Sequence, residues 1–169
     1  MTMIILYAQP YDMSAKGFCF TSVAEFKAKA QNLKNTHGNI VEEFEIQFID
    51  GPAIDAALAE AVGLNQVNFN SYFEAVETWN DHDKRIVIIA CGDLGHSFDE
   101  STLPDDFEIN VYYLRSLKEL AEEFVTEGLY GEIPPQFEFY IDYEAVGRDL
   151  AMDYAEAEIA GEYLIYRAA

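Results

Sequence analysis

Residues 93–100, with the sequence DLGHSFDE, gather the side-chain types that bind metal ions. Asp93, His96, Asp99 and Glu100 lie close together, and carboxylates beside a histidine could hold a divalent cation. Their spacing matches neither an EF-hand loop nor a zinc motif. We therefore favour a solvated loop over a metal site, and we predict no metal and no other cofactor.

Pairs of acids recur along the chain and could serve general acid–base catalysis. Catalytic carboxylates need burial or a charged neighbour to perturb their pKa. Here the acids fall on the polar faces of predicted amphipathic helices, in water, so we predict no catalytic residues and keep a hydrolase only as a weak alternative. The segment from Gly92 to Gly95 is not a phosphate loop, because both G-x-G-x-x-G and G-K-[ST] are missing.

The most regular acidic array lies on residues 116–127. Ser116 and Glu119 form an S-x-x-E capping box, which predicts a helix start. Apolar residues follow at helical spacing and predict one buried stripe: Leu117, Leu120, Ala121, Phe124 and Val125. Gly128 suits a left-handed helix end, and Pro134 prevents continuation. The opposite face carries four acids: Glu119, Glu122, Glu123 and Glu127.

Such a helix carries charge at nearly the density of a DNA strand. Twelve helical residues span about 18 Å, and B-DNA of that length shows roughly 10 phosphates, about five per strand. Four glutamates come close to the charge of one strand. An acidic helix can therefore imitate a duplex backbone, although any acidic interaction protein would share this arithmetic.

The whole chain is strongly acidic. Its 169 residues hold 31 acids and 10 bases, a net charge of −21, and the excess grows from −2 over residues 1–50 to −7 over 51–100 and −12 over 101–169. Half of the residues are apolar, which predicts a folded protein rather than a disordered tail. An acidic surface attracts basic surfaces and repels nucleic acids and membranes. Solubility and a halophile's surface are two simpler explanations of the charge.

Cysteine usage and the apolar runs predict a cytoplasmic protein. Cys19 and Cys91 lie 72 residues apart without a C-x-x-C spacing, so we expect two free, buried thiols in a reducing compartment. Residues 1–8 are apolar but short and lack a basic n-region, so we expect no signal peptide. No apolar run approaches 18 residues, and we expect no membrane span.

The elements that position these residues predict an elongated α+β protein of three small sub-domains, with a mainly helical middle and short sheets in the two outer units. Residues 1–51 form an N-terminal α+β unit with strands over 3–9, 17–20 and 43–50. A capping box at Ser22 and Glu25 begins its helix, which runs to about Leu33 and buries Phe26.

Residues 52–106 form the mainly helical middle unit. A helix over 53–62 ends at Gly63, and a third capping box, Ser71 and Glu74, predicts a helix to about Asn80. The segment 85–92, RIVIIACG, stays open, because its β-branched residues favour a strand and the family resemblance described below favours a helix. A loop with one short helical turn completes the unit.

Residues 107–169 form the C-terminal α+β unit around the acidic helix. Strands over 108–114 and 162–167 are expected to lie side by side. Pro134 and Pro135 begin a helical segment that is expected to bury three side chains: Phe137, Tyr140 and Ile141. Asp142 caps a further helix over 143–152, and Asp153, Glu156 and Glu158 continue the acidic line beyond it.

Three linked segments of this unit resemble the C-terminal half of the ArdA antirestriction proteins. They are LAEEFVTEGLYGEIP (120–134), YIDYEAVGRDLAMDY (140–154) and EIAGEYLIYR (158–167). The ArdA proteins are acidic DNA mimics that inhibit type I restriction–modification enzymes. The resemblance is close over residues 111–167, whereas over 64–108 it is limited to general composition.

The resemblance implies a non-catalytic homodimer that occupies the DNA-binding channel of a type I restriction–modification enzyme and contacts its specificity and modification subunits. The acids expected to imitate phosphates lie in the C-terminal half: Glu119, Glu122, Glu123, Glu127, Glu132, Asp142, Glu144, Asp149, Asp153, Glu156 and Glu158. The candidate dimer interface is apolar: Phe124, Leu129, Tyr130 and Ile133. An acidic chaperone or regulator of another DNA-binding protein is the alternative.

Overall fold

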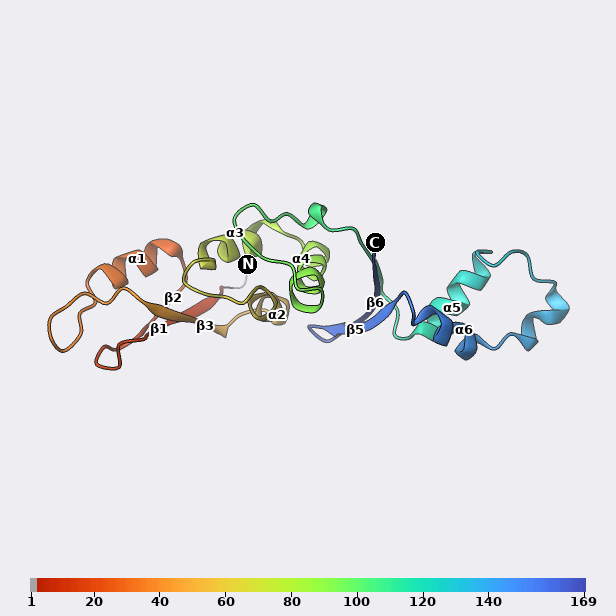
Figure 1. Cartoon of the computed structure of the whole chain (residues 1–169), viewed down its shortest axis with the longest axis horizontal. Helices are drawn as coiled ribbons and strands as arrows, with labels where there is room; N and C mark the ends of the chain where they lie inside the picture. Colours follow the sequence, from red (N-terminus) through yellow and green to blue (C-terminus); the bar gives the residue numbers. More distant parts are fainter. Residues whose placement is uncertain (1–2) are drawn as a thin grey trace. The chain divides into compact units, whose positions relative to one another are not determined.

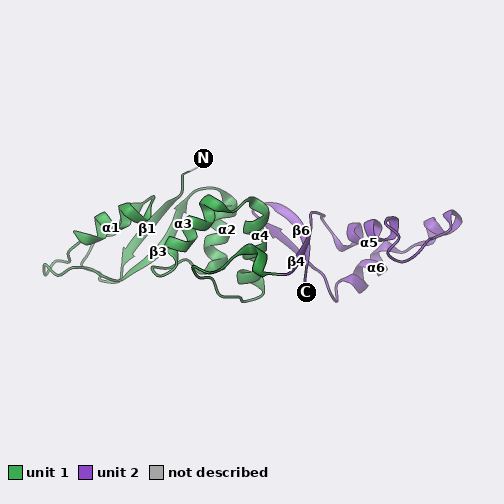
Figure 2. Cartoon of the chain, turned by 90° about the horizontal axis from the view of Figure 1, so that it is seen from above, with its two compact units in different colours: residues 1–107 green, residues 108–169 purple. Residues whose placement is uncertain are grey.

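A computed structural model describes residues 3–169, and the chain divides into two compact units (Figures 1 and 2). Unit 1 is Met1–Phe107 and unit 2 is Glu108–Ala169. Each contains helices and a three-stranded antiparallel sheet, which confirms the predicted α+β class. Residues 1–8 were predicted not to be a signal peptide. Two of them, Met1 and Thr2, lie outside the described residues.

The sheet of unit 1 has the order β2-β1-β3. Its strands are β1 (Ile5–Pro10), β2 (Phe18–Phe20) and β3 (Phe44–Asp50). Leu6 and Ala8 alternate with more exposed residues along β1, because successive side chains of a strand point to opposite faces. A Cβ on Gly17 would lie 2.5 Å from the carbonyl oxygen of Ala8, so the chain needs glycine where it turns into β2.

Helices make up the rest of unit 1. They are α1 (Val23–Gln31), α2 (Ala53–Val62), α3 (Phe69–Thr78), α4 (Asp81–Ile88), the π-helical η1 (Ile89–Asp93) and the 3-10 helix η2 (Pro104–Asp106). The predicted cap of α1 is confirmed, since Ser22 Oγ accepts the Glu25 N–H at 3.1 Å. Gly63 ends α2 in the left-handed conformation, with φ 64°.

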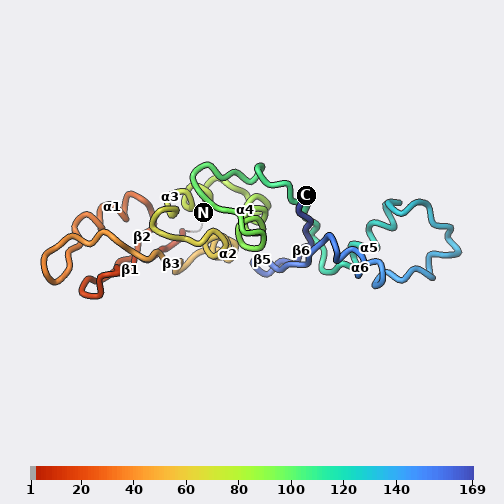
Figure 3. The backbone as a smooth tube through the Cα atoms, in the orientation of Figure 1, coloured from red at the N-terminus to blue at the C-terminus, as the bar shows by residue number. Residues whose placement is uncertain are grey.

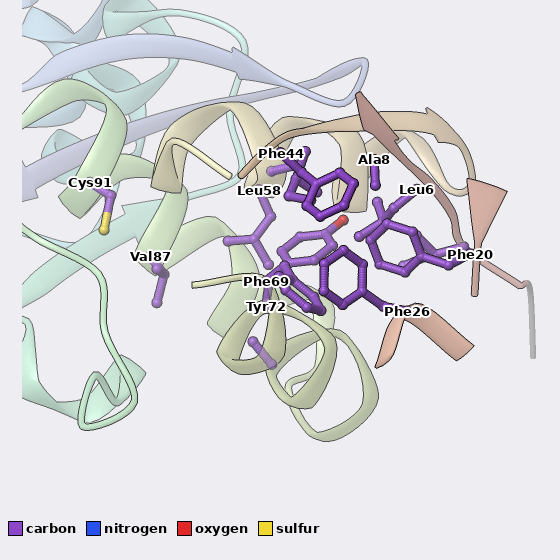
Figure 4. Packing of buried hydrophobic residues seen from close by; sticks show 14 of the residues in the cluster. Leu6, Ala8, Phe20, Phe26, Phe44, Leu58, Phe69, Tyr72, Val87 and Cys91 are labelled. Carbon is purple, nitrogen blue, oxygen red and sulfur yellow. The ribbon is translucent and has the colours of Figure 1, made fainter. Parts of the chain in front are cut away.

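The core of unit 1 is rich in aromatic rings from both the strands and the helices (Figure 4). The rings of Phe26 and Phe69 lie 4.7 Å apart between centroids, and those of Phe20 and Phe26 lie 5.1 Å apart. Residues on both sides of residue 51, among them Leu6 and Leu58, share this cluster. The division into three sub-domains stays a prediction.

Two expectations for the middle of the chain are settled by the fold. The segment 85–92 is helical, because it lies within α4 and η1, and Asn80 caps this helix by accepting the Asp83 N–H at 2.9 Å. The predicted capping box at Ser71 and Glu74 is wrong, because α3 already begins at Phe69. The side chain of Asn65 accepts the N–H groups of the preceding turn instead.

The sheet of unit 2 has the order β4-β6-β5. Its strands are β4 (Ile109–Tyr112), β5 (Ala155–Ile159) and β6 (Glu162–Ala168). The predicted pairing of the segments 108–114 and 162–167 is confirmed, as antiparallel β4 and β6. β5 was not predicted, and it joins β6 through Ala160 and Gly161, both with positive φ, as tight hairpin turns require.

The helices of unit 2 are α5 (Leu117–Thr126), the 3-10 helix η3 (Pro135–Tyr140) and α6 (Tyr143–Leu150). α5 packs against α6, and its stripe buries Leu120 and Phe124 against Ile165 of β6. Between α5 and α6 the backbone runs out and back as a wide loop (Figure 3).

Within this loop the helix at Pro135 forms as predicted, but the predicted burial of its aromatic side chains is wrong. Phe137 is 55% exposed and Tyr140 is 82% exposed, while Ile141 is half-buried. The small core of unit 2 is completed by Tyr112 and Tyr154 instead. The loop therefore displays aromatic side chains to solvent.

Both cysteines are free thiols, as predicted. Cys91 is buried in η1, where burial raises the pKa of its thiol. Cys19 is exposed on the edge strand β2, which corrects the expectation of two buried thiols. No helix within residues 3–169 combines the length and the apolar character that crossing a membrane would require.

Candidate partner-binding surface

The start of α5 is fixed by two of the acids predicted to imitate phosphates. Ser116 Oγ accepts the Glu119 N–H at 3.2 Å, and Glu119 Oε2 accepts the Arg115 N–H at 2.8 Å. From β5, Glu156 Oε1 accepts the Leu117 N–H at 2.9 Å. These carboxylates satisfy N–H groups that a helix start leaves free, so Glu119 and Glu156 have a structural role besides their charge.

The remaining acids of α5 lie on the face opposite its buried stripe. Glu122 and Glu123 are exposed in the middle of the helix, and Glu127 is exposed at its C-cap. Leu120, Ala121 and Phe124 bury the other face. The helix thus presents carboxylates to solvent while its apolar side chains hold it on the sheet.

The other predicted acids are also exposed and lie on several elements of unit 2. Asp142 caps α6 by accepting the Ala145 N–H at 3.0 Å. Glu144 lies 3.9 Å from Lys118 Nζ, a long surface contact of little energetic value. The remaining positions lie in the loop, on or just after α6, and on β5: Glu132, Asp149, Asp153 and Glu158.

The bases of unit 2 neutralise little of this charge. Residues 108–169 contain 14 acids and four bases, a net charge of −10. Two of the bases lie over aromatic rings: the Arg115 guanidinium is 5.6 Å from the Tyr163 ring, and that of Arg167 is 5.5 Å from Tyr154. The result is a small scaffold with a dense, exposed array of carboxylates.

Comparison with protein families matches residues 16–164 to the family described as "Antirestriction protein (ArdA)". The chain belongs to the ArdA antirestriction family. The match spans unit 1 as well as unit 2, although resemblance over 64–108 was limited to composition. A search of curated proteins found no match.

The apolar residues predicted for a dimer interface divide into two groups in this ArdA family member. Phe124 is buried in the core of unit 2, so its ring is covered by its own chain. Leu129 and Tyr130 are 64% and 54% exposed, and half-buried Ile133 lines a cavity of about 590 Å³ beside them. Phe139, which the sequence did not single out, is 95% exposed nearby in the same loop.

The loop at residues 93–100 has internal hydrogen bonds. Asp99 accepts the N–H and the hydroxyl of Ser101 at 2.8 and 2.6 Å, and the Ser101 hydroxyl above all lowers the pKa of the Asp99 carboxyl. The His96 ring lies 5.0 Å from that of Phe107. Across residues 3–169 no group of three potential metal ligands comes together.

One charged group was missed by the sequence analysis. Asp55 of α2 and Lys84 of α4 are almost fully buried in unit 1, and Lys84 Nζ lies 2.7 Å from Asp55 Oδ1. Tyr72 donates its hydroxyl to the Asp55 carbonyl at 2.7 Å, and burial raises the pKa of Tyr72. Nothing in the sequence marks the pair, because its two members lie far apart on separate helices.

Proposed function

We propose that this antirestriction protein is an acidic DNA mimic that occupies the DNA-binding channel of a type I restriction–modification enzyme. It contacts the specificity and modification subunits there and excludes DNA without catalysing a reaction. The observation that supports this proposal is the exposed carboxylate array of unit 2, because a channel that binds phosphates is lined by basic side chains.

The density of the array suits such a channel. The 10 residues of α5 span about 15 Å, at about 1.5 Å per residue. B-DNA of the same length carries roughly nine phosphates, between four and five per strand. Glu119, Glu122, Glu123 and Glu127 therefore supply nearly the charge of one strand on one helix and its cap.

The exposure of three of these acids also supports a role in binding rather than in catalysis. A catalytic carboxylate is placed where burial or a neighbouring charge perturbs its pKa. Glu122, Glu123 and Glu127 instead face solvent on the outside of α5. Each of them is suited to a phosphate-like contact with a basic side chain.

We further propose that the protein is a homodimer joined through the loop between α5 and α6. Leu129, Tyr130 and Ile133 supply apolar area there, and in a two-fold interface each protomer presents the same patch. Two strongly acidic chains repel each other, so dimerisation should strengthen as salt screens that repulsion. A protein that sediments as a monomer at low and at high salt would refute the dimer.

A competition experiment tests the main proposal. The protein should displace a fluorescent duplex from a type I restriction–modification enzyme, and it should leave the duplex on an unrelated DNA-binding protein. Equal displacement from both would instead favour the alternative of a general acidic chaperone or regulator. Failure to displace the duplex from any type I enzyme tested would refute the proposal.

A further inference from the structure

The outer end of the loop between α5 and α6 exposes three aromatic side chains, which we call the η3 aromatic patch (Figures 1 and 3). Phe137, Phe139 and Tyr140 are 55%, 95% and 82% exposed. The chain has 12 phenylalanines, and within residues 3–169 the two in η3 are the only exposed ones. Exposed apolar groups gathered in this way mark an interaction site.

The backbone beneath the patch is well defined. Pro134 and Pro135 fix two φ angles, and the Phe137 N–H donates to the Pro134 carbonyl at 2.9 Å. Asp142 then begins α6 directly after η3 by accepting the Ala145 N–H. Rings presented on an ordered backbone lose little conformational freedom when they bind. The patch is therefore suited to serve as an anchor within a larger contact.

The sequence around the patch carries only negative charge. Residues 119–147 contain eight acids and no lysine, arginine or histidine. Nucleic acids can stack their bases on exposed rings, but these acids repel phosphates, whether of a nucleic acid or of a membrane. A second copy of the chain would bring the same eight acids, and the homodimer proposed above uses residues of the loop before Pro134. The charge thus favours a basic protein surface as the occupant.

Arginine is the basic side chain that can use a ring and a carboxylate together. Its planar guanidinium stacks on aromatic faces and pairs with a carboxylate through two N–H groups, whereas the lysine ammonium is a point charge. Glu138 is exposed between Phe137 and Phe139 in the sequence. Unit 2 already contains contacts of this kind, since two of its own arginines lie 5.6 and 5.5 Å from the centroids of tyrosine rings.

We infer that the η3 aromatic patch receives arginine side chains of the partner protein, which stack on its rings while Glu138 pairs with a guanidinium. This inference rests on the proposed function, because a DNA-binding channel offers arginines to phosphates. It also goes beyond that function. Exposed carboxylates attract any basic surface, whereas stacking on rings selects arginine over lysine.

Two peptides test this selection on the full chain. Acetylated hexa-arginine amide and hexa-lysine amide carry the same charge, so the acids alone should bind them equally. In an NMR titration hexa-arginine should shift the ring signals of Phe139 and Tyr140 and should bind roughly ten-fold more tightly than hexa-lysine. Equal affinities, or hexa-arginine binding that leaves these ring signals in place, would overturn the inference.

A double variant that changes no charge separates stacking from apolar burial. Phe139→Leu with Tyr140→Leu keeps apolar side chains but removes two ring faces. It should weaken hexa-arginine binding roughly ten-fold and hexa-lysine binding no more than about two-fold. Both side chains are exposed, so the melting temperature should be unchanged. A double variant that retains the preference for arginine would overturn the inference.

Two further variants serve as controls. Phe139→Trp keeps a ring face and should retain the preference for hexa-arginine. Tyr11→Leu removes a ring that is 65% exposed in unit 1, and it should leave the affinity for hexa-arginine within about two-fold of wild type. A loss in Tyr11→Leu as large as that in the double variant would overturn the inference, because any exposed ring would then serve.

Two measurements identify the occupant of the patch. In displacement of duplex from a type I enzyme, the double variant should be several-fold weaker than Tyr11→Leu, and equal potency would overturn the inference. In sedimentation the double variant should keep the oligomeric state of wild type, and loss of a wild-type dimer would assign the patch to a second copy instead. If the wild-type protein displaces no duplex, the proposed function fails, while the peptide titration still decides whether the patch prefers arginine.

Discussion

The two units differ in the size of their buried cluster and in the density of their negative charge. Unit 1 surrounds a large aromatic cluster, whereas unit 2 contains a smaller cluster around Leu120, Phe124 and Ile165. Unit 2 has a net charge of −10 in 62 residues, and unit 1 has −11 in 107. Like charges oppose compaction, so the core of unit 2 has to withstand a denser charge repulsion than the core of unit 1.

The largest expected effect is therefore in the core of unit 2. Phe124→Ala should cost about 3–5 kcal/mol of stability and should melt α5 from the sheet. Trp79, the only tryptophan, lies in unit 1 and packs edge-on near Phe98. Its fluorescence follows the unfolding of unit 1, whereas far-UV circular dichroism follows both units. The fall in melting temperature caused by Phe124→Ala should therefore be smaller by fluorescence than by circular dichroism.

A matched control for this experiment is Phe137→Ala, because Phe137 is 55% exposed and its truncation should leave the melting temperature nearly unchanged. If Phe124→Ala lowers the melting temperature equally by fluorescence and by circular dichroism, the two units unfold together. The difference in core and charge between the units would then not lead to a difference in stability. An unchanged melting temperature would show that Phe124 is not part of the core.

The next effect concerns the buried charges of unit 1. Lys84→Met removes the ammonium and leaves Asp55 buried without its partner, which should cost about 3 kcal/mol or more. Replacing both residues, as Lys84→Met with Asp55→Leu, should recover most of that loss, since apolar pairs can substitute for buried ion pairs. Urea unfolding of the two variants measures the difference, and equal stabilities would contradict it.

A third effect should be confined to binding by unit 2. Exposed charge contacts contribute about 0.2–1 kcal/mol each, so Glu122→Gln alone should barely change displacement of duplex. Replacing Glu122, Glu123 and Glu127 together by Gln should weaken it roughly ten-fold. The helix cap survives, because Ser116 and Glu119 are retained.

The control for this prediction carries the same change of charge on unit 1. Glu42, Glu45 and Glu74 are exposed there, and their joint replacement by Gln should weaken displacement far less. Equal losses would mean that net charge, not the position of the acids, determines binding. Complete loss of inhibition in Glu122→Gln, with the fold intact, would point to a single essential carboxylate and against mimicry.

The smallest effect is a pH dependence at the start of α1. A hydrogen bond from Lys29, with further ones from Thr21, lowers the pKa of Glu25 from 4.5 to about 2. Because the folded pKa lies below the unfolded value, this carboxylate stabilises the protein above pH 4.5 and loses that contribution as pH falls toward 2. The melting-temperature gap between wild type and Glu25→Gln should therefore close over that window. A gap that stays constant from pH 5 to pH 2 would contradict the assignment.

Local sequence rules account for the helix that carries most of the proposed surface. Both the cap at Ser116 and Glu119 and the apolar stripe through Leu120 and Phe124 were predicted, and both are present. Such features depend on residues three or four apart on one helix. The strand pairing of β4 with β6 was also predicted, because both segments are rich in β-branched and aromatic residues.

Tertiary contacts decided the remaining features. The β-branched segment 85–92 is helical and packs against α2, so burial outweighs its strand propensity. β5 contains alanine and glutamate, which are poor strand formers, and it forms through pairing with β6.

Burial of individual side chains likewise followed the fold rather than the local pattern. Tyr140 is exposed because the loop between α5 and α6 lies outside the core of unit 2. The pairing of Asp55 with Lys84 arises only where α2 meets α4. Sequence alone thus determined the acidic character, the family and the local helix signals, because these depend on composition and on near neighbours. Which side chains are buried, and which charges meet, depended on contacts between segments distant in the chain.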